Sequence, residues 1–273
     1  MWLRLILVFL AAGAISEGGF WLARHSAELG PEAFSACASR IAPRWGWHES
    51  RSNLANAKTR RILFVGNSLT SVNDLPGMVV TVANADPSAP FSLKVRSITA
   101  PGATLSGLWS EGCGPERLAA DHFNAVVLQE HSFFWDDTDN PDQAGEAAGR
   151  WMSAARTSGA APLYFQPWTG PPIKGDGAFE EGEMKESTRK IANIYGAQLL
   201  RVGEAFAEAQ TTPGAPDLFQ SDRHHASEAG TWLAALVIFH GLTGEESSSS
   251  AWRPAGVSPE QAAVIQGIAD RYG

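Results

Sequence analysis

One short stretch constrains the fold more than any other part of this sequence. The apolar run 62–65 (Ile-Leu-Phe-Val) is followed at once by Gly66 and then by the polar pair Asn67 and Ser68. Such a run predicts a buried strand, and a glycine before two polar residues predicts a tight turn. A helical pattern follows over 75–85, so the chain is expected to pass here from strand through turn to helix.

Similar units recur along the chain. Further apolar segments predict strands, and each is separated from the next by enough residues for a helical crossover. Strands that alternate with helices predict an α/β fold of three layers, in which a five-stranded parallel sheet lies between helices. The later predicted strands are 91–98, 125–128, 161–165 and 198–202, and the longer predicted helices are 142–155, 180–195, 228–240 and 259–271.

The N-terminal residues have the layout of an export signal. A positively charged start precedes an uninterrupted apolar run, and small residues follow it. We therefore expect a signal peptide over 1–16, a spacer over 17–59, one α/β domain over 60–273, and a periplasmic or secreted protein. The alternative is a membrane anchor formed by 1–22, since apolar residues continue beyond the first break.

Charge and cysteine content limit the class of protein. The chain of 273 residues carries a net charge of −8 with both signs interspersed, which argues against a nucleic-acid surface, since such a surface would be basic. A membrane partner is expected only if the N-terminal segment is retained. Cys37 and Cys113 are the only cysteines; they form one disulfide in an exported chain, or remain two unpaired thiols.

Three side chains from distant parts of the sequence predict a nucleophilic site. Ser68 follows the first strand, where ligands bind in a parallel sheet, and Asp222 and His225 come just before the helix 228–240. A carboxylate three residues before a histidine can accept the imidazole Nδ1–H and leave Nε2 facing a serine hydroxyl. The alternative for Ser68 taken alone is a turn serine that caps a helix.

These residues, in this order, resemble the SGNH/GDSL hydrolases over about 61–241. The Gly-Asp-Ser-like turn of that family is matched by Gly66–Leu69, and its C-terminal Asp-x-x-His by Asp222 and His225. The resemblance implies the flavodoxin-like fold of the family and a catalytic triad of Ser68, Asp222 and His225. It implies no cofactor.

The oxyanion contacts are where this sequence departs from the family pattern. The family's glycine after the second strand is present as Gly102, and its backbone N–H and that of Ser68 are expected to bind the oxyanion. The family's asparagine after the third strand is replaced by Gln129, whose amide is expected to fill the same role. Asn67 stands in place of the turn's aspartate and is expected to structure the turn through side-chain hydrogen bonds. Some carbohydrate esterases are similar to this chain in having a Gln-Glu pair, here Gln129 and Glu130.

Further side chains follow the strand ends and could contact substrate. Trp109, Trp135 and Trp168 come after the second, third and fourth strands, so they could line one rim; core or lid packing is the alternative. Glu130 could order its loop or lie in solvent, and His131 could touch substrate or have a structural role. The weak substrate-binding candidates are Asn67, Glu130, His131, Trp109, Trp135 and Trp168.

A metal site is not expected. Asp222, His224 and His225 carry metal-binding groups, but two neighbouring histidine side chains point apart in most backbones. His224 is expected to be an exposed neighbour of the base, because the three-residue spacing from Asp222 selects His225.

The function predicted by these residues is a serine esterase that hydrolyses carboxylic esters through an acyl-enzyme. Export and the rim tryptophans favour a carbohydrate ester, such as an acetylated sugar. One alternative is a lipid esterase or thioesterase, which would need an apolar acyl slot. The other is a non-catalytic carbohydrate-binding protein on the same fold, and the intact Ser68, Asp222 and His225 count against it.

Overall fold

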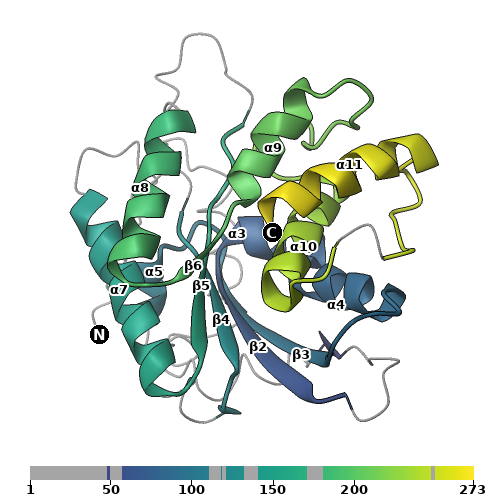
Figure 1. The fold of residues 1–273 in the computed structure, drawn as a ribbon. Coiled ribbons are helices and arrows are strands. Elements are labelled where there is room, and N and C mark those ends of the chain that lie inside the picture. The colour runs from purple at the N-terminus through teal and green to yellow at the C-terminus, as the bar shows by residue number, and fades with distance from the viewer. Residues whose placement is uncertain are drawn as a thin grey trace, which may run out of the picture.

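The computed structural model describes residues 48–49, 57–110, 118, 121–131, 141–170, 181–246 and 250–273. These residues form one sheet with helices on both of its faces (Figure 1). The elements that carry the argument are β1 (His48–Glu49), β2 (Thr59–Gly66), α3 (Ser68–Ser71), η2 (Val72–Asp74), α4 (Leu75–Ala85), β3 (Ser92–Thr99), α5 (Leu105–Leu108), β4 (Ala125–Gln129), α7 (Pro141–Thr157), β5 (Ala161–Phe165), α8 (Glu181–Ile194), β6 (Gln198–Leu200), α9 (Val202–Thr211), α10 (Glu228–Thr243) and α11 (Pro259–Tyr272).

The strand order confirms the predicted parallel sheet and adds one strand to it. The order is β1-β3-β2-β4-β5-β6, and the five strands from β2 to β6 are all parallel to their neighbours. Their order is the flavodoxin-like one, which places its ligand crevice between the first and third strands of the set, here β2 and β4. The addition is β1, which pairs antiparallel with β3 through His48 and Glu49. It lies within the expected spacer 17–59, and two residues are too few to show a strand periodicity in sequence.

The near-continuous apolar runs of the strands follow from burial on both faces. In β2, Ile62 and Phe64 point into a core beneath α4, α9, α10 and α11, while Leu63 and Val65 point into a second core beneath α5 and α7. Figure 1 shows these two helical layers on opposite sides of the sheet. The strands from β2 to β6 have side chains in both cores. A shift of one residue would exchange the side chains between the two cores, so packing fixes the register of each strand.

Two C-terminal helices show how local signals set the element ends. Ser227 caps α10 by accepting from the Gly230 N–H, and Gly244 ends that helix with φ of 76°. Ser258 and Gln261 form the reciprocal capping box at the start of α11. These signals place α10 directly after the loop that carries Asp222 and His225.

Several predictions concern residues outside the described part of the chain. The export signal at 1–16, most of the spacer, Cys37, Cys113 and Trp135 all belong to this group. Among the residues that are described, no helix is both long enough and apolar enough to span a bilayer.

Candidate active site

The structure brings Ser68, His225 and Asp222 into one hydrogen-bonded chain. Ser68 is the first residue of α3, directly after the turn that ends β2. Its Oγ lies 2.9 Å from Nε2 of His225, and Nδ1 of His225 lies 2.6 Å from Oδ2 of Asp222. Because a carboxylate accepts from Nδ1–H, Nε2 is left as the acceptor for the serine proton. The arrangement is that of a nucleophile, its base and the acid that orients the base.

The Asp222 carboxylate is stabilised in its charged form. Its Oδ1 accepts from the backbone N–H groups of His224 and His225, each at 2.9 Å. Partial burial pushes the pKa of Asp222 upward, but these bonds and the His225 side chain outweigh it and lower the pKa to about 2. Asp222 therefore stays ionised at any pH at which the imidazole can act as a base.

Asn67 structures the serine turn, as the sequence predicted, and also ties it to a second loop. Its Oδ1 accepts from the Leu69 N–H at 3.1 Å and so caps α3. Its Nδ2 donates to the carbonyl of Ala103 at 3.1 Å. Asn67 is 2% exposed, so it is a structural residue of the turn and the weak prediction that it binds substrate is wrong for this geometry. The second bond needs an amide, since a carboxylate has no proton to donate.

Gln129 does not lie in the oxyanion site, which corrects the prediction from the sequence. Its Oε1 accepts from the Asn67 N–H at 3.0 Å and from the Thr70 hydroxyl at 2.9 Å. Its Nε2 donates to the carbonyl of Glu130, and the side chain is fully buried. The extra methylene carries the amide beneath the turn, where all of its bonds are made to the protein. Gly66 leaves room for it, because a Cβ there would lie 2.6 Å from Gln129 Oε1.

The Gly102 loop offers a backbone N–H at the same sheet edge. Ala103 N–H donates to the Ala100 carbonyl at 3.1 Å, which closes a turn with Pro101 and Gly102 at its centre. Gly102 has φ of 67°, so the turn is of type II and favours glycine at that position. Ala100 N–H in turn donates to the Gly66 carbonyl, which places this turn beside the serine turn. Ser68 and Gly102 remain the candidates for oxyanion donors.

The Glu130 side chain is fully buried beneath the site, so it contacts neither solvent nor substrate. Its Oε1 accepts from the Leu105 N–H at 3.1 Å and from the His131 N–H at 2.8 Å. Burial raises the pKa of Glu130 to about 7, although these two bonds act in the opposite direction. The expectation that Glu130 orders a loop agrees with these contacts, and the expectation of substrate contact does not.

Burial lowers the pKa of both histidines near the base, His224 and His131. Burial lowers the pKa of His224 to about 4, and the nearby His225 and His131 act in the same direction. The rings of His224 and His225 lie 4.8 Å apart at 76°. His224 is thus half-buried, not the exposed neighbour expected from its sequence. His131 lies close enough to affect His224, so it stays a candidate for substrate contact.

Trp168 does not line the rim of the site. It is 1% exposed and stacks on Phe206 with ring centroids 4.3 Å apart. Its Nε1–H donates to the carbonyl of His224 at 2.9 Å, so it supports the histidine loop from below. The prediction that it contacts substrate is wrong because the strand end directs it into the core.

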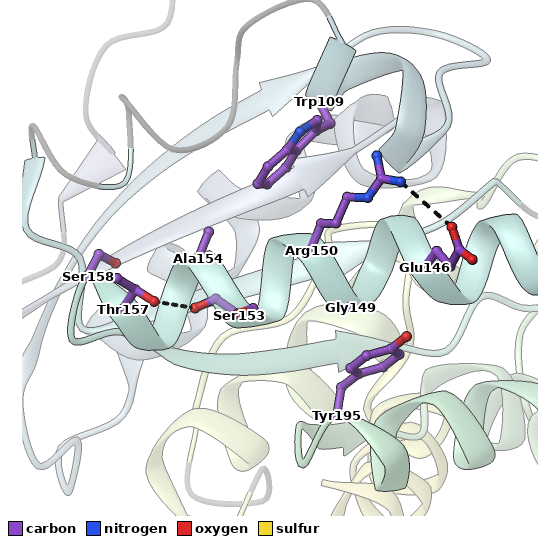
Figure 2. A pocket seen from close by; sticks show the side chains of 9 residues that line it. All are labelled: Trp109, Glu146, Gly149, Arg150, Ser153, Ala154, Thr157, Ser158 and Tyr195. Carbon is purple, nitrogen blue, oxygen red and sulfur yellow. Dashed lines mark hydrogen bonds and ion pairs between the residues drawn. The ribbon is translucent and has the colours of Figure 1, made fainter.

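Trp109 lies in a different depression of the surface. Its ring packs edge-on against Trp151 at 5.3 Å. It borders a groove of about 770 Å³ on the outer face of α7, with Tyr195 on the other side of that helix (Figure 2). The residues that line this groove include none of the triad, so Trp109 gives no support to a tryptophan rim at the active site.

Two residues that the sequence did not single out hold parts of the site together, one across to the histidine loop and one down to β4. Asn73 donates through Nδ2 to the carbonyl of Ala226, the residue after His225, at 2.9 Å. It adopts φ of 53°, which asparagine tolerates better than most residues. Thr70 donates to Gln129 as described above. An asparagine or threonine after a catalytic turn carries no spacing signal, so only the folded chain reveals these contacts.

Comparisons with known proteins agree with this fold. No family model matches the sequence, and no curated protein is significantly similar to it. Among solved structures, a DUF4886 family protein from Bacteroides uniformis matches with a TM-score of 0.63 and 16% identity, over 78% of this chain and 94% of that one. A protein from Slackia heliotrinireducens that is assigned to the SGNH hydrolases matches with a TM-score of 0.53 and 27% identity, over 68% of this chain and 100% of that one.

An enzyme of stated activity has the same fold. A catalytic mutant of Axe2, an acetylxylan esterase from Geobacillus stearothermophilus, matches with a TM-score of 0.58 and 15% identity, over 69% of this chain and 96% of that one. The fold of this chain is that of the SGNH/GDSL hydrolase-like superfamily, which confirms the resemblance read from the sequence.

Proposed function

We propose that this chain is a serine esterase that hydrolyses carboxylic esters through an acyl-enzyme. The observation that carries the proposal is the bonded chain of Ser68 Oγ, His225 and Asp222, with distances of 2.9 Å and 2.6 Å. A fold of the SGNH hydrolase type supports it, since the Slackia heliotrinireducens protein shares both the fold and 27% of its aligned residues.

The proposed reaction has two halves. In the first, Ser68 Oγ attacks the ester carbonyl while His225 Nε2 takes the serine proton, and the same proton then passes to the departing alcohol. In the second, water attacks the acyl-Ser68 carbonyl, His225 accepts a proton from that water, and Ser68 recovers it as the acid leaves. Asp222 stabilises the imidazolium of both halves without itself gaining a proton.

Two backbone donors are proposed to stabilise the tetrahedral oxyanion. They are the N–H groups of Ser68, at the start of α3, and of Gly102, in the type II turn. Each such donor contributes about 3 kcal/mol to transition-state stabilisation in hydrolases of this kind. Gln129 is left out of this set because its amide is buried and bonded elsewhere.

Short acyl groups on carbohydrate are the substrate class that we favour. The structural likeness to Axe2, an acetylxylan esterase, supports this choice. An export signal at residues 1–16 would also bring the enzyme to extracellular polysaccharide. The rim tryptophans no longer support it, because Trp168 is buried and Trp109 borders another groove.

A fluorophosphonate probe tests the nucleophile directly. We expect the probe to label wild-type protein at Ser68. We also expect wild-type protein to hydrolyse p-nitrophenyl acetate, and this activity to be lost in proportion to the labelling. Ser68→Ala should remove both signals while leaving the melting temperature nearly unchanged. A folded wild-type protein that takes no label and hydrolyses no ester would favour the non-catalytic carbohydrate-binding alternative.

The length of the acyl chain tests the substrate class. We expect p-nitrophenyl acetate to be turned over faster than the octanoate, and acetate to be released from acetylated xylooligosaccharide. A preference for the octanoate would instead favour the lipid esterase or thioesterase alternative, with the same triad at work.

A further inference from the structure

Gln129 is the last residue of β4 and Glu130 follows it directly, and both side chains are fully buried. Buried amide and carboxyl groups are costly unless the protein satisfies them, so their partners indicate what they hold. Gln129 accepts from the Asn67 N–H, in the serine turn. Glu130 accepts from the Leu105 N–H, at the end of the Gly102 loop. Two consecutive residues therefore form hydrogen bonds to both loops that carry the proposed oxyanion donors.

The two loops are also joined to each other and to the helical layer. Asn67 donates to the Ala103 carbonyl at 3.1 Å, which closes a triangle between β4, the serine turn and the Gly102 loop. The Nε1–H of Trp151, on α7, donates to the Leu105 carbonyl at 3.0 Å. Leu105 is thus held from one side through its N–H by Glu130 and from the other through its carbonyl by Trp151.

We propose that Glu130 is a positioning residue, whose carboxyl oxygen Oε1 holds the Gly102 loop in the place relative to Ser68 that oxyanion stabilisation requires. This inference rests on the esterase function proposed above. Glu130 itself is buried, so it acts through the backbone N–H of Leu105, three residues after Gly102. Oxyanion donors act by preorganisation, and a displacement of about 1 Å can cost on the order of 100-fold in rate.

The contacts of Glu130 show which of its atoms matters. Oε1 accepts two N–H groups, while Oε2 has no hydrogen-bond partner among the described residues. The Tyr164 hydroxyl on β5 is likewise buried without a partner there, and its pKa is raised by burial and then by the charge of Glu130. Holding the Leu105 and His131 N–H groups therefore requires an acceptor oxygen at the Oε1 position, but it does not require a second, charged oxygen. Glutamine supplies the first without the second.

Variants of the full-length chain test the proposal by separating kcat from KM. For p-nitrophenyl acetate we expect Glu130→Ala to lower kcat on the order of 100-fold with KM changed less than about threefold. Glu130→Gln should stay within about threefold of wild type, because it keeps the acceptor oxygen. Should Glu130→Ala not fold, Glu130→Asp serves in its place, since the shorter side chain withdraws the acceptor from Leu105 and should lower kcat about tenfold.

Gln166 provides a matched control at the next strand end. Its buried side chain accepts from the Glu204 N–H at 3.1 Å and donates to Thr188, so it ties helices that carry no proposed donor. Gln166→Ala should lower the melting temperature while kcat stays within about threefold of wild type.

Each outcome separates this inference from the esterase proposal. Rescue by Glu130→Gln, with loss in Glu130→Ala or Glu130→Asp, supports positioning. A wild-type kcat in Glu130→Ala and Glu130→Asp overturns positioning. An equal loss of kcat in Gln166→Ala, at the same loss of stability, also overturns it. A wild-type chain without hydrolysis and without label at Ser68 overturns the proposed function instead, and this result needs no variant at position 130.

Discussion

The serine and the histidine of the candidate site are held in place by two different kinds of structure. The serine turn is buried, and its centre, Asn67, is 2% exposed and bonded to Gln129, Leu69 and Ala103. The histidine loop lies at the surface, and the Asp222 side chain is 46% exposed. The turn is thus positioned by residues far away in the sequence, whereas the loop is positioned largely by its own neighbours.

The bonds of the histidine loop are mostly short in sequence. The Asp222 carboxylate accepts from the backbone N–H groups of His224 and His225. The Gln220 N–H donates to the His225 carbonyl at 2.8 Å. Trp168 adds a bond from the core to the His224 carbonyl. We infer that changes at the buried residues of the serine turn, such as Gly66 and Asn67, reduce stability and activity together. Changes in the histidine loop should reduce activity with little loss of stability.

The largest effect should come from Asp222→Asn. The amide can still accept from the backbone N–H groups, but it presents N–H₂ to the imidazole and so favours the wrong tautomer. We expect kcat to fall about 1,000-fold while the melting temperature changes by less than about 2 °C. Asp217→Asn is the control, because this carboxylate is exposed in the same loop and pairs with Arg223. A large fall in the melting temperature of Asp222→Asn would contradict the contrast drawn above.

Gly66→Ala should damage both properties of the serine turn. The new Cβ would lie 2.6 Å from Gln129 Oε1 and 2.6 Å from Thr70 Oγ1, so the buried amide must shift. We expect unfolding in urea to show a loss of about 2 kcal/mol, with kcat reduced at least about tenfold. In a Gln129→Ala background the same change should cost at least about 1 kcal/mol less. Additive effects of the two substitutions would show that the amide does not cause the requirement for glycine.

Two carboxylates, the buried Glu130 directly after β4 and the more exposed Asp222 of the histidine loop, should give opposite pH dependence of stability. Burial raises the pKa of Glu130 from 4.5 to about 7, so between these values the folded chain keeps a proton that the unfolded chain has lost. Its stabilising effect is complete below pH 4.5 and is lost as the pH rises toward 7. Asp222, with a pKa lowered to about 2, has the opposite sign: its contribution is present above about pH 4 and is lost as the pH falls toward 2. Because this side chain is 46% exposed, solvent screening keeps the contribution small.

Glu130→Gln isolates the buried group. Relative to this variant, the unfolding free energy of wild type should decline by up to about 3 kcal/mol between pH 4.5 and 7.5. Urea titrations at several pH values measure the difference. Parallel curves for the two proteins would mean that Glu130 is not buried as described.

The smallest effect should come from Trp168→Phe, which removes the link between the core and the histidine loop. Phenylalanine keeps the stacking on Phe206 but cannot donate to the His224 carbonyl. We expect kcat to fall about three- to tenfold, with a loss of about 1 kcal/mol in unfolding free energy. An unchanged kcat would show that the loop holds His225 without help from the core.

Much of the fold and the triad could be predicted because their signals are local. The runs 62–65, 125–128 and 161–165 became buried strands, since a strand buried on both faces must be apolar throughout. Asp222 and His225 were recognisable because three residues of loop suffice to bring their side chains together. The antiparallel β1 was missed, since its two residues carry no pattern of their own.

Two of the wrong site predictions concern side chains whose direction the sequence pattern did not define. Gln129 is the last residue of β4 and Trp168 comes three residues after β5, and both were expected to face the site. Both lie beyond the strands predicted at 125–128 and 161–165, where a sequence pattern assigns a side chain to neither face of the sheet. Packing decided the matter, placing the amide beneath Gly66 and the indole against Phe206.

The amino-acid sequence by itself determined most of the elements, their order, and the identity of the serine, histidine and aspartate that form the hydrogen-bonded chain. Only the tertiary structure decided which buried groups hold those three residues, because partners such as Gln129 and Asn67 are 62 positions apart. Hydrophobic periodicity and helix capping act over a few residues, so both can be recognised in the sequence. A buried hydrogen bond depends on where two distant backbones come to rest, and its partners become known only once the core has closed around them.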